Sequence, residues 1–158
     1  DFSKLNLPLY VAATELSAGV TEYFYEGPLY KALLATSSIP LVFPAVMDRP
    51  KLYVDGGILN NLPIEPIREE CDLLIGVHMN SIAKGCDMPL GVRKTFDRIF
   101  HLALGNAVYA KSQYCDLFID PPAMTQFGML EKKEAHKIYE YAYAHAMQQL
   151  ESNPVKLK

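Results

Sequence analysis

Short apolar runs recur along this chain of 158 residues. The runs Leu7–Thr14 and Leu73–Met79 are almost continuously apolar, which is typical of strands buried on both faces. Residues 20–25 alternate between apolar and polar and predict a half-buried strand. A hairpin is expected over residues 45–54, around a turn that contains proline, and a brief strand over Leu117–Ile119.

Helix-like segments lie between these strands. Pro28 suits the start of a short helix over residues 29–35, and a second short helix is expected over Pro63–Glu70. Two long amphipathic helices are predicted over Arg93–Tyr114 and Glu131–Leu150. Their expected buried stripes are Phe96, Ile99, Phe100, Ala103, Ala107 and Ala110 in the first, and Ala135, Ile138, Ala142 and Ala146 in the second. Strands that alternate with helices in this way predict an α/β sheet with both faces covered.

Composition supports a single globular domain and removes several classes of function. Half of the residues are apolar and 21% are charged, so the chain can bury a core. A net charge of −3 provides no basic surface, and nucleic acid is not an expected partner. No apolar stretch reaches about 20 residues, which argues against a membrane-spanning helix.

The cysteines and histidines do not form a metal pattern. Cys71, Cys86 and Cys115 lack C-x-x-C spacing, and the helical histidines have no partners at ligand spacing. We therefore expect no metal site. Three free thiols favour a reducing compartment, so a cytoplasmic location is expected.

Asp55 is the strongest candidate for chemistry. It ends an apolar, strand-like run and precedes Gly56 and Gly57, which can take positive φ angles and let another backbone or a ligand approach closely. Burial in an apolar cleft would raise the pKa of this carboxyl group and make it a better general base. Asn60 and Asn61 follow, and they are expected to hydrogen-bond the turn and hold the direction of the carboxylate.

A nucleophile to match this base is not evident. The chain contains no Gly-x-Ser-x-Gly elbow and no Gly-rich phosphate or oxyanion loop. Ser37 and Ser38 precede Pro40 and are better interpreted as the end of a helix. His78 follows Asp55 in the order of a Ser-Asp-His triad, but a histidine at a strand end more often satisfies local hydrogen bonds. A base without its nucleophile indicates part of an enzyme.

Three blocks in a fixed order carry a family resemblance. They are AATEL at 12–16, ATSSIPLVFP at 35–44 and VDGGILNNLP at 54–63. Together they resemble the patatin-like phospholipase family, in particular its bacterial branch of predicted serine esterases. The likeness runs from about residue 7 to residue 80, and its specificity lies in the order and spacing of the blocks.

The resemblance implies a three-layer α/β/α sandwich of the patatin type, with residues 1–158 as the incomplete, C-terminal part of one acyl hydrolase domain. It implies hydrolysis of lipid, phospholipid or other carboxylic esters by a Ser–Asp dyad, without metal or organic cofactor. Asp55 matches the catalytic aspartate of the family, and the residues expected to shape the turn and the substrate site are Gly56, Gly57, Asn60 and Asn61. The serine would lie in the missing N-terminal part, so the isolated chain is expected to be inactive.

The expected partners follow from this interpretation. They are an ester substrate, the missing part of the domain or a second copy covering an apolar strand edge, and a membrane surface contacted peripherally. One alternative is a non-catalytic binding or regulatory module in which Asp55 is only a turn residue. A sugar- or nucleotide-binding protein ranks lower, because no phosphate loop is present. The tyrosine-rich run 139–143 could form a lipid-facing belt, but a packing helix fits its amphipathic pattern better.

Overall fold

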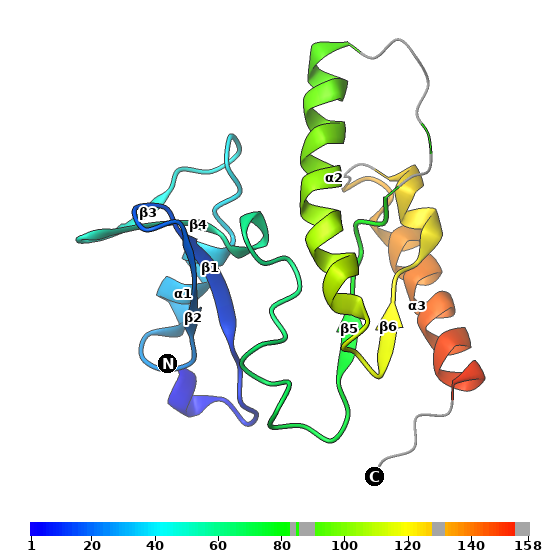
Figure 1. The fold of residues 1–158 in the computed structure, drawn as a ribbon, viewed down its shortest axis with the longest axis horizontal. Helices are drawn as coiled ribbons and strands as arrows, with labels where there is room; N and C mark the ends of the chain where they lie inside the picture. Colours follow the sequence, from blue (N-terminus) through cyan, green and yellow to red (C-terminus); the bar gives the residue numbers. More distant parts are fainter. Residues whose placement is uncertain (83–84, 86–90, 128–131, 154–158) are drawn as a thin grey trace. The chain divides into compact units, whose positions relative to one another are not determined.

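The computed structural model describes residues 1–82, 85, 91–127 and 132–153. Cys86 and Glu131 lie outside the described residues. The chain divides into two compact units, Asp1–Glu69 and Glu70–Lys158, and each is described by itself (Figure 1). Both contain helices and strands, so the mixed α/β class predicted from the sequence is confirmed.

The first unit is built on a four-stranded antiparallel sheet in the order β2-β1-β4-β3 (Figure 1). Its strands are β1 (Val11–Glu15), β2 (Val20–Phe24), β3 (Val46–Asp48) and β4 (Lys51–Asp55). All five residues of β1 are buried, because this strand lies between two others and is covered on both faces. The predicted two-sided strand is therefore confirmed, although it starts at Val11 and leaves Leu7 exposed.

A short helix, α1 (Leu29–Thr36), packs against this sheet (Figure 1). Ala32 and Ala35 face the strands and are each 1% exposed. Small side chains at these positions let the helix approach Ala13 and Tyr53 of the sheet closely. The helix ends at Ser37, as the sequence predicted.

The short helix expected over Pro63–Glu70 is wrong. The structure has consecutive turns there, in which the N–H groups of Ile67 and Arg68 both donate to the carbonyl of Ile64. Pro66 explains the difference, because it has no N–H to donate and keeps the preceding residue out of the helical region.

The second unit contains a two-stranded parallel sheet of β5 (Ile75–Val77) and β6 (Leu117–Ile119). Helix α2 (Val92–Ser112) contacts β6 through the rings of Tyr109 and Phe118, whose centroids are 6.3 Å apart. Helix α3 (Ala135–Ser152) also packs against β6. Three short 3-10 helices complete the described secondary structure: η1 (Phe2–Lys4), η2 (Gly56–Ile58) and η3 (Pro122–Gln126).

Strand β5 is not buried on both faces, contrary to the prediction. Ile75 is 43% exposed and Val77 is 54% exposed, whereas Leu74 and His78 on either side of the strand are buried. The continuous apolar run hid this alternation, because apolar residues on a covered face and on an open face look alike in sequence.

Among the described members of the predicted α2 stripe only Phe100 is half-buried, and the prediction is otherwise wrong. Ile99 is 60% exposed, and Ala103, Ala107 and Ala110 are exposed as well. The helix instead buries Gly105 and Val108. The side chain of Ile82 lies so close to Gly105 that a Cβ there would be 2.4 Å from its Cδ1 atom, so the packed face is the one with least bulk. The side chain of Phe96 lies outside what the structure describes.

Helix α3 follows its predicted stripe only in part. Ile138, Ala142 and Ala146 are half-buried, whereas Ala135 is exposed and no residue of the helix is fully buried. Tyr139 and Tyr143 are 63% and 56% exposed, with their rings stacked at 5.9 Å. Among the helices in the described ranges, none combines the length and apolar character that crossing a bilayer requires.

Candidate active site

Contacts with Ala13, Thr14 and Ser38 hold the backbone of Asp55 at the end of β4. It pairs with Ala13 in the antiparallel ladder between β1 and β4. Its N–H donates to the carbonyl of Ser38 at 3.0 Å, and its carbonyl accepts a bond from Thr14 Oγ1 at 3.0 Å. Alternate residues of a strand share a face, so Asp55 belongs to the face that carries Tyr53, against which α1 packs.

The carboxylate of Asp55 is fixed by the turn that follows it. Its Oδ1 atom accepts a hydrogen bond of 2.7 Å from the N–H of Gly57 and caps η2. Burial raises the pKa of Asp55 above its ordinary value, although the bond from Gly57 acts in the opposite direction. The raised pKa is the direction that the apolar sequence around Asp55 predicted.

The two glycines are needed for space rather than for backbone conformation. Neither takes a positive φ angle, so that part of the expectation is wrong. A Cβ on Gly56 would lie 2.2 Å from the carbonyl oxygen of Ala12, and one on Gly57 would lie 2.8 Å from Asn61 Oδ1 and 3.1 Å from Asp55 Oδ1. The predicted close approach of another backbone is therefore confirmed at Gly56.

Asn60 anchors the turn to β2. It is buried, and its Nδ2 atom donates to Tyr23 Oη at 2.7 Å and to Glu65 Oε2 at 2.9 Å. Tyr23 Oη donates to the same carboxylate oxygen at 2.9 Å. Burial, reinforced by the contact with Glu65, raises the pKa of Tyr23 to about 12. The sequence predicted bonds from Asn60 to its own turn, and its backbone N–H makes one, to Gly56 O at 2.9 Å.

All five residues singled out in the sequence line one cleft of about 310 Å³. They are Asp55, Gly56, Gly57, Asn60 and Asn61. Much of the remaining wall is apolar and includes Leu9, Val11, Ala12 and Leu33. The cleft thus presents a carboxylate of raised pKa beside an apolar wall, an arrangement that can hold an acyl chain and take a proton from a group docked against Asp55.

The serines nearest in sequence to this cleft do not supply the nucleophile. Ser38 Oγ is directed at the carbonyl of Leu34, to which it donates at 2.7 Å, and the residue is only 4% exposed. Ser37 caps the end of α1. Both residues end the helix, as the sequence predicted.

Comparison with known proteins finds a family match for the segment that contains the cleft. Residues 8–68 match a family described as patatin-like phospholipase. We call residues 8–68, which are similar to that family, the patatin-like segment. The match includes all three blocks on which the resemblance was based.

Relatives of the chain extend the likeness beyond the patatin-like segment. An uncharacterized NTE family protein of Mycobacterium tuberculosis is 39% identical over 84 residues, which cover 52% of this chain and 23% of that protein. The lysophospholipase nte1 of Aspergillus fumigatus is 23% identical over an alignment of 171 positions, which covers 92% of this chain and 11% of that protein. The chain therefore spans less than a quarter of the length of these relatives.

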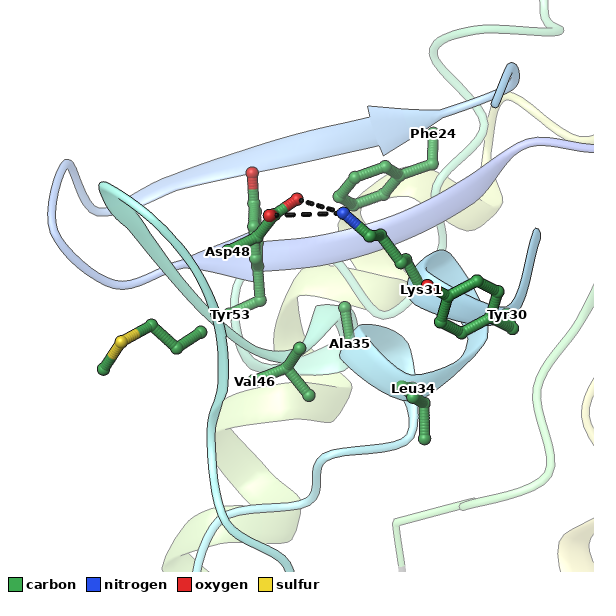
Figure 2. Close-up of a pocket in the computed structure, with 9 residues that line it drawn as sticks. Phe24, Tyr30, Lys31, Leu34, Ala35, Val46, Asp48 and Tyr53 are labelled. Carbon is green, nitrogen blue, oxygen red and sulfur yellow. Dashed lines mark hydrogen bonds and ion pairs between the residues drawn. The ribbon is translucent and has the colours of Figure 1, made fainter. Parts of the chain in front are cut away.

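The patatin-like segment has a second pocket, of about 220 Å³, between α1 and the β3–β4 hairpin. Figure 2 shows Lys31 Nζ facing both carboxylate oxygens of Asp48. It lies 3.3 Å from each of them. Both side chains are about half exposed, so this ion pair contributes little to stability. The carboxylate of Asp48 is paired with a cationic side chain, whereas the bond from Gly57 to Asp55 comes from an uncharged backbone N–H, and this distinguishes the pocket from the Asp55 cleft.

His78 has a local partner outside the patatin-like segment. Its Nδ1 atom lies 3.2 Å from Asp120 Oδ1, which also accepts a bond of 2.5 Å from Ser81 Oγ. Tyr109 Oη donates to the other oxygen of Asp120 at 2.6 Å. Burial acts to raise the pKa of Asp120, but the bonds from His78, Ser81 and Tyr109 outweigh it and lower the pKa. Nδ1 of His78 thus has a local partner, as its place at a strand end led us to expect, whereas its buried Nε2 atom has no hydrogen-bond partner among the described residues. No signal in the sequence indicated this cluster.

The structure also describes two of the cysteines. Cys71 is exposed and Cys115 is half-buried, and both are free thiols. Within the described part of the chain, no group of three or more histidine, cysteine, aspartate or glutamate side chains is placed to bind a metal ion.

Proposed function

We propose that this chain supplies the general base of a serine acyl hydrolase that acts on lipid or other carboxylic esters. One observation carries the proposal. In the patatin-like segment, a half-buried carboxylate with a raised pKa faces an apolar cleft from a hydrogen-bonded turn. The names of the relatives support a lipid substrate, because one of them is a lysophospholipase.

The reaction would use Asp55 twice. Asp55 takes the proton of a serine hydroxyl while the serine oxygen attacks the ester carbonyl, and it returns that proton to the leaving alcohol as the tetrahedral intermediate collapses. An acyl-enzyme remains. Asp55 then takes a proton from water, whose oxygen attacks the acyl carbon, and the proton returns to the serine as the carboxylic acid leaves. No cofactor is needed for these steps.

The serine would come from polypeptide outside this chain, in the N-terminal part of the same domain. Ser38, whose backbone touches Asp55, directs its hydroxyl elsewhere. We therefore propose that the isolated chain is inactive and that its partner is the part of the domain that carries the nucleophile.

Replacement of Asp55 by asparagine in the full-length protein tests this role. Asp55→Asn should lower the kcat for a carboxylic ester by about 10⁴-fold or more, because the nucleophile loses its base. Folding should persist, since asparagine keeps an oxygen that can accept the bond from Gly57. The raised pKa means that ionised Asp55 does not stabilise the fold at neutral pH.

Asp72→Asn is the matched control, because Asp72 is exposed and lies outside the patatin-like segment. Its ester turnover should equal that of the wild type. Retained turnover in a folded Asp55→Asn protein would refute the proposal and favour a binding module in which Asp55 only shapes the turn.

A further inference from the structure

The turn over residues 39–44, here called the apolar turn, exposes three large hydrophobic side chains in succession. Leu41 is 89% exposed, Val42 is 47% exposed and Phe43 is 55% exposed. From residue 39 to residue 47 the sequence reads IPLVFPAVM and contains no charged or polar side chain. Consecutive apolar residues held in water in this way are unfavourable unless another apolar phase covers them.

The backbone of the apolar turn satisfies its own donors. The N–H groups of Val42 and Phe43 both donate to the carbonyl of Ile39, at 3.1 and 2.9 Å. Pro40 and Pro44 have no N–H, so the N–H of Leu41 is the single remaining donor of residues 40–44. The small number of unpaired N–H groups lowers the free-energy cost of moving the turn from water into lipid, although its carbonyl groups carry a cost of their own.

The conformation at Leu41 is unusual for its residue type. Its φ angle is 69°, in the left-handed region that leucine rarely adopts. The surrounding turn therefore fixes a leucine in an unfavourable backbone state while its side chain stays in solvent. Such a residue is a candidate for function rather than for packing.

The apolar turn is joined directly to the candidate base. The carbonyl of Ser38, the residue before the turn, accepts the hydrogen bond from the N–H of Asp55 at 3.0 Å. The hydroxyl of Ser38 donates a hydrogen bond to the carbonyl of Leu34, and the side chain of Leu34 is itself exposed, at 56%. Any surface that the turn enters is consequently brought close to the Asp55 cleft.

We propose that the apolar turn inserts into the surface of a phospholipid layer and so presents the Asp55 cleft to the ester bonds at that interface. This inference rests on the proposed function and deepens it. A lipid surface suits the turn better than a protein partner does, because the turn provides neither a free strand edge nor polar groups for specific pairing. Without charge in the turn, binding should depend little on salt.

Sedimentation of the full-length protein with phosphatidylcholine vesicles tests the insertion. The double variant Leu41→Ser with Phe43→Ser should lower the vesicle partition coefficient by about tenfold or more, since two large apolar side chains no longer enter the lipid. Val92→Ser with Ile99→Ser is the matched control, because these residues are 90% and 60% exposed. The control should bind as the wild type does, and turnover of a water-soluble short-chain ester should stay within about twofold in both variants.

Three outcomes would overturn the inference. The wild-type protein could fail to bind the vesicles, or the turn variant could bind as well as the control. Alternatively, the turn variant could lose its native elution volume in size-exclusion chromatography while it keeps vesicle binding, which would make the turn a contact between polypeptides.

Catalysis and insertion are separated by the Asp55→Asn variant. It should bind vesicles as the wild type does while it loses ester turnover. Vesicle binding that depends on the apolar turn, in a protein without any esterase activity, would leave the insertion standing and reject the proposed function.

Discussion

At Asp55, opposing effects act on a single carboxylate. The bond from the N–H of Gly57 favours the charged form, while burial disfavours it and prevails, so the pKa is raised. The same bond fixes the direction of the side chain. The carboxylate is therefore both more basic than one in open water and held in one orientation, which are the two properties that a general base needs. Its neighbours can be tested residue by residue.

The two glycines after Asp55 should differ in their tolerance of a methyl group. Gly56→Ala should lower the free energy of unfolding by about 1–3 kcal/mol, because the new Cβ would meet backbone that cannot move away. Gly57→Ala should cost less, since its nearest contact is the end of the Asn61 side chain. Urea denaturation of both variants would check the order. A larger loss for Gly57→Ala would show that the approach of Ala12 to Gly56 is not what requires glycine.

At the scale of elements, local sequence patterns located several helices and strands, but they did not locate the faces that the long helices bury. The β3–β4 hairpin, α1 and β6 could be located because each is set by nearby residues, such as Pro28 before the helix. The buried face of α3 could be located only in part, and that of α2 hardly at all, because a helix packs where its neighbours leave room, as at Gly105, and not always on its most apolar stripe. Pro66 did carry a local signal against the helix predicted over 63–70.

Glu15, at the end of β1, links three segments of the first unit and should make its stability depend on pH. Hydrogen bonds from the N–H groups of Ser17, Ala18 and Leu52 lower the pKa of Glu15 to about 2, against the opposing effect of burial. Because the folded-state pKa is depressed, the stabilisation is complete above pH 4.5 and is lost as the pH falls toward 2.

Glu15→Gln should therefore lower the melting temperature at neutral pH, and the difference from the wild type should shrink below pH 4.5 and vanish near pH 2. Thermal unfolding followed by circular dichroism across this range would measure it. Glu26→Gln, at an exposed position, is the control and should follow the wild type. A difference that stays constant with pH would mean that the charge of Glu15 is not what holds the turn.

For the whole molecule, the residues of the candidate site could be predicted, but the contacts that support them could not. Asp55, the glycines and the asparagines are close in sequence, and the structure brings them into one cleft. Tyr23 and Glu65, which bind Asn60, are 42 residues apart, and only the folded sheet brings them together. The chain spans under a quarter of the length of the relatives named above, and the serine that we propose as nucleophile would come from polypeptide outside this chain.

The central claim, that Asp55 activates a serine supplied by another part of the polypeptide, is tested most directly by the pH dependence of fluorophosphonate labelling of the full-length protein. The labelling rate should rise as Asp55 loses its proton, with a midpoint above the ordinary aspartate value of 3.8, and Asp55→Asn should remove this rise and leave only slow labelling. An Asp55→Asn protein that is labelled at the wild-type rate, with the same pH dependence, would contradict the account.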